Sequence, residues 1–422
     1  MKAIKIKRVL LAIPLISFFL MVAKANAIEN DVLLYAKDTA NFATIAISPT
    51  TSLDTGVTIS NEGNLFIWGF RGSGQQGNGS NVVSNTAAPA PVFTFMNQGL
   101  KVVTAAGGAY HFVALDESGG VWSWGLNNYN QVGCISGLGA SSTPCRLLTN
   151  AVQIAAGEYI SYALTKDGDV YSWGTGYYGQ RGDGSTKTLD AGLKRVNLPE
   201  KIRLLGGAYE GGYAVGFSGK IYAWGDNEDC AFGYGGYSGS DPCRGRQEVP
   251  NPQQLIATGI NGNQISSISG GNAHTIILLE NGNVYGIGRG NSLGQGITNY
   301  TQGNSASPRL ILKNVESIYN RYVGSVAVTF DGKIYTWGET SGSAFPTIYG
   351  NSPTLRTPSL ASGEYIVKID GGKEHFYYTT NTGKMYGVGY GAARKLNDSS
   401  SANVAWPGVR MTFVENAIKS YE

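Results

Sequence analysis

The sequence predicts an all-β protein, a seven-bladed β-propeller of four-stranded antiparallel blades. Three observations predict this fold: one hairpin pattern recurs seven times, successive copies lie 49 to 63 residues apart, and the 60 glycines do not follow the triplet period of collagen. Four short strands in each interval match one propeller blade. A β-helix would need much shorter repeats, and a leucine-rich solenoid would show a regular ladder of leucines.

The first 27 residues are interpreted as a secretory signal peptide. A basic start is followed by the apolar run Val9–Val22, and Ala25-Asn26-Ala27 supplies the small-x-small cleavage pattern. The run is shorter than the roughly 20 residues of a membrane-spanning helix, and Pro14 interrupts it, which disfavours a retained anchor. We therefore expect cleavage near Ala27, a single propeller domain over residues 28–422, and a secreted, periplasmic or cell-surface protein.

Charge argues against a nucleic-acid partner. The signal segment contains five of the 32 basic residues and none of the 29 acidic ones, so the remaining chain has a formal net charge of −2. A near-neutral chain without a Lys/Arg cluster lacks the electrostatic footprint of a DNA- or RNA-binding protein. After the signal segment, no stretch is long and apolar enough to span a bilayer, so we also expect no membrane span.

Each repeat contains an apolar strand, a turn that ends in Gly, and an alternating strand that ends in Trp-Gly or a relative of it, as in VALDESGGVWSWG. Most of the turn glycines follow Asn, Asp or Ser, and such pairs suit the positive φ angles of tight hairpin turns. The turn glycines are Gly63, Gly119, Gly168, Gly219, Gly282, Gly332 and Gly383. The closing position holds Trp68, Trp124, Trp173, Trp224 and Trp337, and in the two looser copies Ile287 and Val388.

Two further strands complete each repeat. A short apolar segment precedes the hairpin, as at Val152–Ala155, and another follows it, as at Pro308–Leu312. We find no convincing amphipathic helix. Both Asn41–Ser48 and Asn416–Glu422 resemble the first strand of a blade, although only one can take that place in the first blade. We favour the C-terminal segment as the one that helps to close the ring.

The repeat also carries a family resemblance. Gly107 to Gly125 combines Gly-Gly-x-x-His, an apolar strand that ends in Ala-Leu, a Gly turn and Trp-x-Trp-Gly, and Gly179 to Gly182 reads Gly-Gln-x-Gly. These motifs resemble the regulator of chromosome condensation repeat, here in an exported, bacterial-type chain, over about residues 40 to 415. The resemblance implies a seven-bladed propeller and leaves the function open. The nuclear member of the family is an exchange factor for a small GTPase, an activity that no residue here marks.

The four cysteines form two local pairs in the sequence. Cys134 and Cys145 lie in the loop after Trp124, and Cys230 and Cys243 lie in the corresponding loop after Trp224. This placement favours two local disulfides over the two crossed pairings. Each would stiffen a projecting loop and stabilise the fold by roughly 2–3 kcal/mol. A Cys₄ metal site is the competing interpretation, but Cys-x-x-Cys spacing and nearby histidines are missing.

We predict no catalytic residue, no metal and no cofactor. The three histidines, His111, His274 and His375, share one repeat position, which a packing role explains. The motifs of serine hydrolases, phosphate-binding loops and zinc proteases are absent, and Asp167 and Asp331 lie in hairpin turns, where Asp suits the backbone. We therefore expect a protein that is not an enzyme. A carboxylate pair from different blades, doing glycosidase- or lyase-type work, stays open as a less favoured alternative.

Aromatic residues concentrate in two sets of loops. Because strand direction alternates, the loop before each hairpin and the loop after each Trp-Gly should emerge on the same face. The first set contains Tyr110, Tyr159, Tyr209 and Tyr322, and the second contains Phe70, Tyr129, Tyr177, Tyr178 and Tyr390. Rigid aromatic rings are typical interface anchors, although packing between neighbouring blades is the competing interpretation for each ring.

These loops predict a monomeric binding module for a protein partner, such as an inhibitor, adhesin, assembly factor or effector. A glycan ligand is the alternative, because loops such as Asn127-Asn128-Tyr129 also suit sugars. An exchange-factor-like effector is less favoured.

Overall fold

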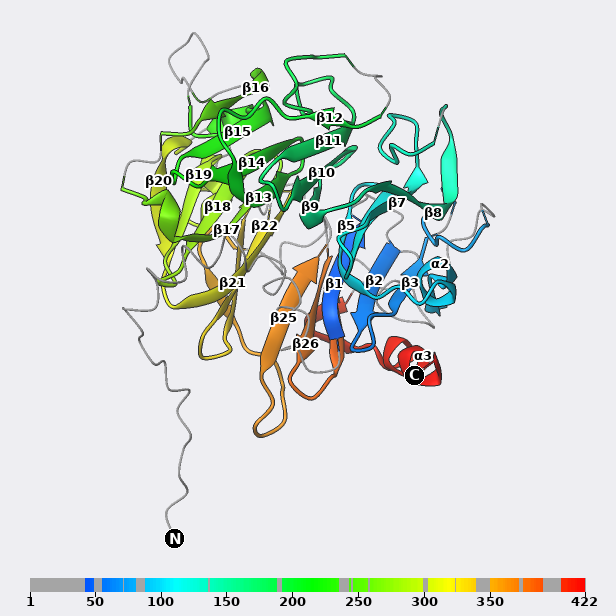
Figure 1. The fold of residues 1–422 in the computed structure, drawn as a ribbon. Coiled ribbons are helices and arrows are strands. Elements are labelled where there is room, and N and C mark those ends of the chain that lie inside the picture. The colour runs from blue at the N-terminus through cyan, green and yellow to red at the C-terminus, as the bar shows by residue number, and fades with distance from the viewer. Residues whose placement is uncertain are drawn as a thin grey trace, which may run out of the picture.

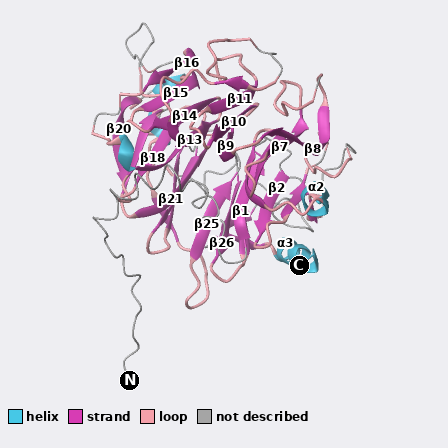
Figure 2. Ribbon diagram, in the orientation of Figure 1, coloured by secondary structure: helices cyan, strands magenta, loops and turns pink. Residues whose placement is uncertain are grey.

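Strands dominate the structure, a computed structural model of the chain (Figure 2). It describes residues 42–48, 55–70, 72–80, 88–135, 137–187, 192–234, 243, 246–256, 259–298, 303–322, 324–338, 350–371, 375–389 and 404–421. Within these residues, 28 strands form seven antiparallel sheets of four consecutive strands each. The first strands of the seven sheets lie side by side in a closed circle, β1 next to β5 and finally β25 next to β1 (Figure 1). The predicted seven-bladed propeller is confirmed.

We call the strands of each blade A to D in chain order. Blade 1 contains β1 (Phe42–Ser48), β2 (Thr55–Ser60), β3 (Leu65–Gly69) and β4 (Ala90–Pro91). Blade 2 contains β5 (Val102–Gly107), β6 (His111–Asp116), β7 (Val121–Leu126) and β8 (Ala140–Leu148). Blade 3 contains β9 (Ala151–Ala156), β10 (Ile160–Thr165), β11 (Val170–Gly174) and β12 (Lys194–Arg195). Blade 4 contains β13 (Ile202–Ala208), β14 (Gly211–Gly216), β15 (Ile221–Asp226) and β16 (Glu248–Gln254).

The last three blades have the same order. Blade 5 contains β17 (Ile265–Gly270), β18 (His274–Leu279), β19 (Val284–Gly288) and β20 (Ser305–Leu312). Blade 6 contains β21 (Val315–Arg321), β22 (Gly324–Thr329), β23 (Ile334–Gly338) and β24 (Thr354–Arg356). Blade 7 contains β25 (Ile366–Gly371), β26 (His375–Thr380), β27 (Met385–Gly389) and β28 (Val404–Arg410). The helices are α2 (Phe93–Asn97), α3 (Thr412–Tyr421) and the short 3₁₀ turns η1 (Glu228–Cys230), η2 (Gly262–Gln264) and η3 (Gly290–Ser292).

The seven turn glycines form the hairpins between strands B and C, as predicted. Their φ angles lie between 76° and 83°, a region that L-residues with a side chain rarely adopt. In blade 2, for example, Leu115 pairs with Val121 across the turn, and Asp116 accepts hydrogen bonds from Ser118 N and Gly120 N at 2.8 Å each. Glycine at this position therefore sets the register of each hairpin.

The closing tryptophans join neighbouring blades. Trp124 of blade 2 is fully buried, and its Nε1 donates to Gln75 O of blade 1 at 2.6 Å. Trp224 of blade 4 likewise donates to Gln180 O of blade 3 at 2.9 Å. Both acceptors lie in the loop after strand C of the preceding blade. At these two junctions the Gly-Gln-x-Gly motif thus covers the tryptophan of the next blade.

The ring closes differently from our expectation. The N-terminal segment forms β1, strand A of blade 1, whereas the predicted C-terminal strand is wrong because the end of the chain folds into the amphipathic helix α3. Val414 and Ile418, one helical turn apart, are buried in a cluster with Phe66 and Trp68 of blade 1 and with Tyr377 and Met385 of blade 7. The expectation of no amphipathic helix is therefore also wrong: α3 covers the junction between the first and last blades.

The predicted signal segment lies outside the described residues. Across the part of the chain that the structure describes, no helix is long and apolar enough to cross a membrane.

Candidate binding face

The loops between strands A and B, called AB loops below, are hydrogen-bonded to one another through their backbones. These bonds run from blade 2 to blade 6, so that five successive AB loops form one arc. The four bonds are Ala109 N to Glu158 O at 2.8 Å, Glu158 N to Tyr209 O at 2.7 Å, Tyr209 N to Gly271 O at 3.3 Å and Asn272 N to Tyr322 O at 2.7 Å. Because backbone groups make these bonds, the arc holds the attached side chains in fixed positions.

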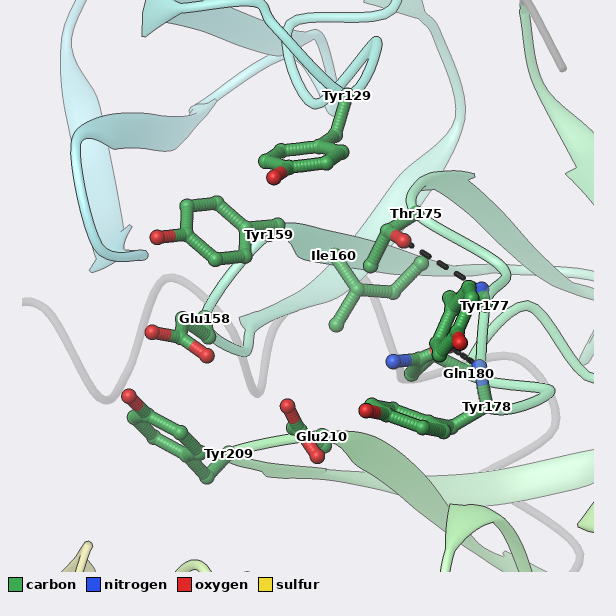
Figure 3. Close-up of a pocket in the computed structure, with 10 residues that line it drawn as sticks. All are labelled: Tyr129, Glu158, Tyr159, Ile160, Thr175, Tyr177, Tyr178, Gln180, Tyr209 and Glu210. Carbon is green, nitrogen blue, oxygen red and sulfur yellow. Dashed lines mark hydrogen bonds between the residues drawn. The ribbon is translucent and has the colours of Figure 1, made fainter. Parts of the chain in front are cut away.

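A cavity of about 340 Å³ opens where blades 2, 3 and 4 meet (Figure 3). We call it the tyrosine cavity. Its walls come from the AB loops of blades 3 and 4 and from the loops after strand C, called CD loops, of blades 2 and 3. The lining residues are Tyr129, Glu158, Tyr159, Ile160, Thr175, Tyr177, Tyr178, Gln180, Tyr209 and Glu210. Five of the nine predicted aromatic residues are therefore brought together from the two predicted loop sets.

The tyrosines of the cavity are held by ring contacts and by short loop hydrogen bonds. The Tyr129 and Tyr159 ring centroids are 4.7 Å apart, and those of Tyr177 and Tyr178 are 4.6 Å apart. Gln180 Oε1 accepts from Tyr178 N at 2.7 Å and so fixes the turn of the CD loop. Tyr177 remains 53% exposed and Tyr129 36% exposed, which leaves ring surface available to a partner.

Two carboxylates lie between the rings. Figure 3 shows the Glu158 carboxylate between Tyr159 and Tyr209, and the Glu210 carboxylate between Tyr209 and Tyr178. Burial and, after it, the charge of Glu158 raise the pKa of the Tyr159 and Tyr209 hydroxyls well above the ordinary value for tyrosine. The phenols therefore stay neutral at physiological pH.

An ion-pair network continues from the cavity into blades 4 and 5. The Arg246 guanidinium lies 4.1 Å above the Tyr178 ring centroid, 3.5 Å from Glu210 Oε2 and 2.8 Å from Asp226 Oδ2. Arg289 pairs with Glu228 at 2.9 Å and with Asp229 at 2.7 Å. Burial and the adjacent Glu210 carboxyl raise the pKa of Asp226 above the usual range of aspartate. Within the described part of the chain, acidic groups thus outnumber basic ones beside the tyrosine cavity.

Comparison with known sequences identifies the repeat. Two sequence profiles of the regulator of chromosome condensation (RCC1) repeat match the chain, one over residues 62–115, 118–164 and 218–278, the other over residues 102–131, 151–180 and 265–295. The chain belongs to the RCC1 repeat family. The matched segments carry the same hairpins and Gly-Gln-x-Gly loops that build the inter-blade contacts described above.

Individual relatives are distant. The chain is 27% identical over 313 residues to the human E3 ubiquitin-protein ligase HERC2, covering 69% of this chain and 6% of HERC2. It is 28% identical over 211 residues to the ultraviolet-B receptor UVR8 of Arabidopsis thaliana, covering 46% of this chain and 44% of UVR8. The chain therefore spans less than half the length of these RCC1-repeat relatives.

Solved structures agree on the fold. Human WBSCR16 superposes with a TM-score of 0.67 at 18% identity, over 82% of this chain and 93% of that one. Yeast RCC1 (Prp20), solved bound to Kap60, superposes with a TM-score of 0.62 at 22% identity, over 78% of each chain. At this level of identity the likeness supports the RCC1-type propeller fold and no more.

The other predicted aromatic residues lie apart from the tyrosine cavity. Phe70 is only 6% exposed and packs edge-on against Tyr110 of the next blade, with ring centroids 6.4 Å apart, so it offers a partner little surface. Tyr322 is half-buried, 5.2 Å from the Tyr209 ring centroid, and so extends the arc. Tyr390 lies outside the described residues.

Asn127 does not have the role that the glycan alternative gave it. It is fully buried, and its side chain accepts from Val132 N at 2.9 Å and donates to Gly137 O at 2.7 Å. Asn227 makes the equivalent bond from Phe232 N in blade 4 at 2.8 Å. Both amides fold their own CD loop. The repeated Gly-x-Asn after the two tryptophans is the sequence signal for this role.

Both predicted disulfides are present. Cys134 is bonded to Cys145 in the CD loop of blade 2, and Cys230 to Cys243 in that of blade 4, with Cα–Cα distances of 6.2 Å and 4.8 Å. The first loop carries Tyr129, and the second begins beside Glu228 and Asp229. Covalent closure therefore stiffens the two loops that flank the tyrosine cavity.

All three histidines are fully buried, as the packing role predicted from their common repeat position requires, and two of them join neighbouring blades. His111 Nε2 lies 2.7 Å from Ser161 Oγ of blade 3, and His274 Nε2 lies 3.0 Å from Ser325 Oγ of blade 6, all fully buried. Burial, followed by the nearby Arg289 charge, lowers the pKa of His274 to about 3, so this ring is neutral. Among the described residues, no group of three or more His, Cys, Asp or Glu side chains could hold a metal ion.

Sequence reasoning missed the charged residues of the site. Glu158 and Glu210 each adjoin an AB-loop tyrosine, in Gly157-Glu158-Tyr159 and Tyr209-Glu210-Gly211. A glutamate next to an AB-loop tyrosine in two repeats could have predicted that carboxylates lie beside the tyrosine rings. Arg246 gave no comparable signal, because only the fold brings the end of its long CD loop over Tyr178.

Proposed function

We propose that this chain is an exported RCC1-type propeller that binds a protein partner through the tyrosine cavity and the adjoining AB-loop arc. One observation carries the proposal: five tyrosines from four loops line a cavity of about 340 Å³. Its volume lies at the small end of ligand pockets, roughly 300–1,000 Å³. Partly exposed tyrosines on fixed loops bind with little loss of side-chain entropy.

Relatives support a binding role. Yeast RCC1 has been solved bound to Kap60, and the work on Prp20p describes binding properties to Gsp1p and histones. By analogy with these propellers, we assign binding and no chemical step to this chain. Export rests on the N-terminal segment, and a mature N-terminus near Ile28 would support it. The glycan alternative is weakened because the Asn127 amide is hydrogen-bonded within its own CD loop and is not free to bind a sugar.

The proposal is tested with Tyr177→Ala. Tyr177 is 53% exposed, so its loss should weaken partner capture from surface extracts by about 1–3 kcal/mol, as for an interface anchor. The free energy of unfolding should change by less than about 0.5 kcal/mol, because the ring contributes little to the core. Capture by the purified full chain, measured alongside urea denaturation, separates the two effects.

Tyr365→Ala is the matched control. Tyr365 is 42% exposed and precedes β25, at the end of strand A opposite the AB loops. Its removal should leave capture unchanged. Equal capture by wild type and Tyr177→Ala would contradict the proposal, and the partner would then use another surface of the ring.

A further inference from the structure

The walls of the tyrosine cavity combine two features that attract cations. Tyrosine faces carry negative electrostatic potential, and a cation within about 6 Å of a ring centroid is stabilised by it. Between these faces lie the Glu158 and Glu210 carboxylates (Figure 3). A cationic group in the cavity would therefore contact aromatic faces and carboxylates together.

One wall already holds a cation of the chain itself. The Arg246 guanidinium lies 4.1 Å above the Tyr178 ring centroid and 3.5 Å from Glu210 Oε2. The rest of the cavity repeats the carboxylate beside tyrosine rings, with Glu158 between Tyr159 and Tyr209. Arg246 therefore shows, within the protein, how such walls bind a guanidinium.

Among the residues that the structure describes, Arg246 and Arg289 do not balance the negative charge. The connected network contains the carboxyl groups of Glu210, Asp226, Glu228 and Asp229, to which Glu158 adds a fifth across the cavity. Even if Asp226 and Glu210 share one proton, four negative charges face two guanidinium groups. The cavity thus favours a positive ligand and repels an anionic one.

We propose that the tyrosine cavity receives a lysine or arginine side chain that the protein partner presents. The inference rests on the proposed function, because it assumes that the partner docks on this face. The volume of about 340 Å³ suits one long side chain better than a folded element. The alkyl part of the side chain would lie against the tyrosine rings, and its charged end would lie between Glu158 and Glu210.

The test uses small probes, so it does not depend on finding the partner. The purified full chain is titrated with Nα-acetyl-lysine methylamide, Nα-acetyl-arginine methylamide and the uncharged Nα-acetyl-norleucine methylamide, and binding is followed by NMR. At least one cationic probe should bind about tenfold more tightly than the norleucine probe, and high salt should weaken that binding. Equal binding of charged and uncharged probes, or no binding of either cation, would overturn the inference.

Charge-removing variants add an independent arm. Glu158→Gln combined with Glu210→Gln keeps side-chain shape and should weaken the cationic probe about tenfold, whereas the exposed hairpin-turn variant Glu117→Gln should not. Partner capture distinguishes the two proposals. If Tyr177→Ala loses partner capture while the double variant retains it, the inference of a cationic side chain is wrong, whereas the proposed binding face is supported. If Tyr177→Ala retains capture, the proposed function itself fails.

Discussion

Phe70 and Tyr177 differ in exposure, and they also differ in their distance along the chain from Trp-Gly. Phe70 directly follows Trp68-Gly69 and is buried, as are Thr175 and Asp226 at the same position in other blades. Tyr177 comes two residues after Thr175 and is 53% exposed. The first residue still follows the end of strand C, whereas the later ones lie at the loop apex. A sequence rule that counts loop aromatics without their distance from Trp-Gly cannot separate buried rings from exposed ones.

A single carboxylate in blade 7 should make stability sensitive to acid. The Glu364 side chain is only 1% exposed, which by itself would raise its pKa, but hydrogen bonds from Lys384, Thr380 and Thr382 outweigh this burial and lower the pKa from about 4.5 to about 2. A pKa depressed by folding stabilises the protein above the unfolded-state value. That stabilisation is lost as pH falls from about 4.5 through about 2.

Glu364→Gln should therefore remove part of the acid dependence. We expect it to lower the free energy of unfolding by about 1–3 kcal/mol at neutral pH and to have a much smaller effect near pH 2. Urea denaturation at several pH values measures this difference. The exposed Glu117→Gln variant should follow wild type throughout. A Glu364→Gln curve parallel to wild type would show that the carboxylate is not held as described.

At the scale of elements, the unit that repeats is the contact between one CD loop and the next tryptophan. Gly182 has a φ of 65°, and a Cβ built there would lie 2.8 Å from Trp224 Cδ1 and 2.7 Å from Val196 Cγ1. Two constraints therefore select glycine at this position: the backbone conformation and the approach of the next blade. A looser approach recurs at Gly77, where the added Cβ would lie 3.1 Å from Trp124 Nε1.

Gly182→Ala should lower the free energy of unfolding by about 2–4 kcal/mol, as core overpacking adds to backbone strain. Gly99→Ala is the matched control, because Gly99 has a φ of 64° and no atom within 4 Å of the added Cβ. Gly99→Ala should lower the free energy of unfolding only by the backbone strain of alanine at positive φ, about 1 kcal/mol. Equal losses in urea denaturation of the two variants would mean that the inter-blade contact contributes nothing.

The elements also show how far the sequence could lead. Hairpins and closing tryptophans were predictable because each depends on a few neighbouring residues, and the hairpin recurs seven times and the tryptophan five times. Helix α3 was not, since the short segment Asn416–Glu422 resembles a strand A, and only the spacing of Val414 and Ile418 shows the helical period. The acidic walls of the cavity depend on which loops meet in space. Arg246 joins that site from a different blade than Tyr178, so spacing along the chain carries no information about it.

At the scale of the whole molecule, α3 connects the two ends of the ring. Met411, Val414 and Ile418 are buried against residues of blades 1 and 7, and Glu415 accepts from Met385 N at 3.0 Å and pairs with Arg410 at 2.8 Å. The helix therefore covers apolar surface of both blades at their junction.

Deleting residues 412–422 should lower the melting temperature by several degrees and increase hydrogen exchange in β3 and β27, because apolar surface of both blades becomes exposed. Deleting only residues 420–422 is the control: it removes the half-exposed Tyr421 ring from Phe66 and Phe93 but none of the buried residues of α3, and it should have a much smaller effect. An unchanged melting temperature after the longer deletion would show that blades 1 and 7 hold together without the helix.

Every blade of this ring is continuous in sequence, so none of the seven described sheets contains strands from both ends of the chain. β1 lies beside β25, yet the two belong to separate sheets (Figure 1). The junction between blades 1 and 7 can therefore open mechanically when the packed side chains of the two blades separate. The strand-to-strand hydrogen bonds within each described sheet stay intact. We expect a pulling force across the ring to open this junction before it unfolds any blade, and the ring could then close again with all seven sheets intact.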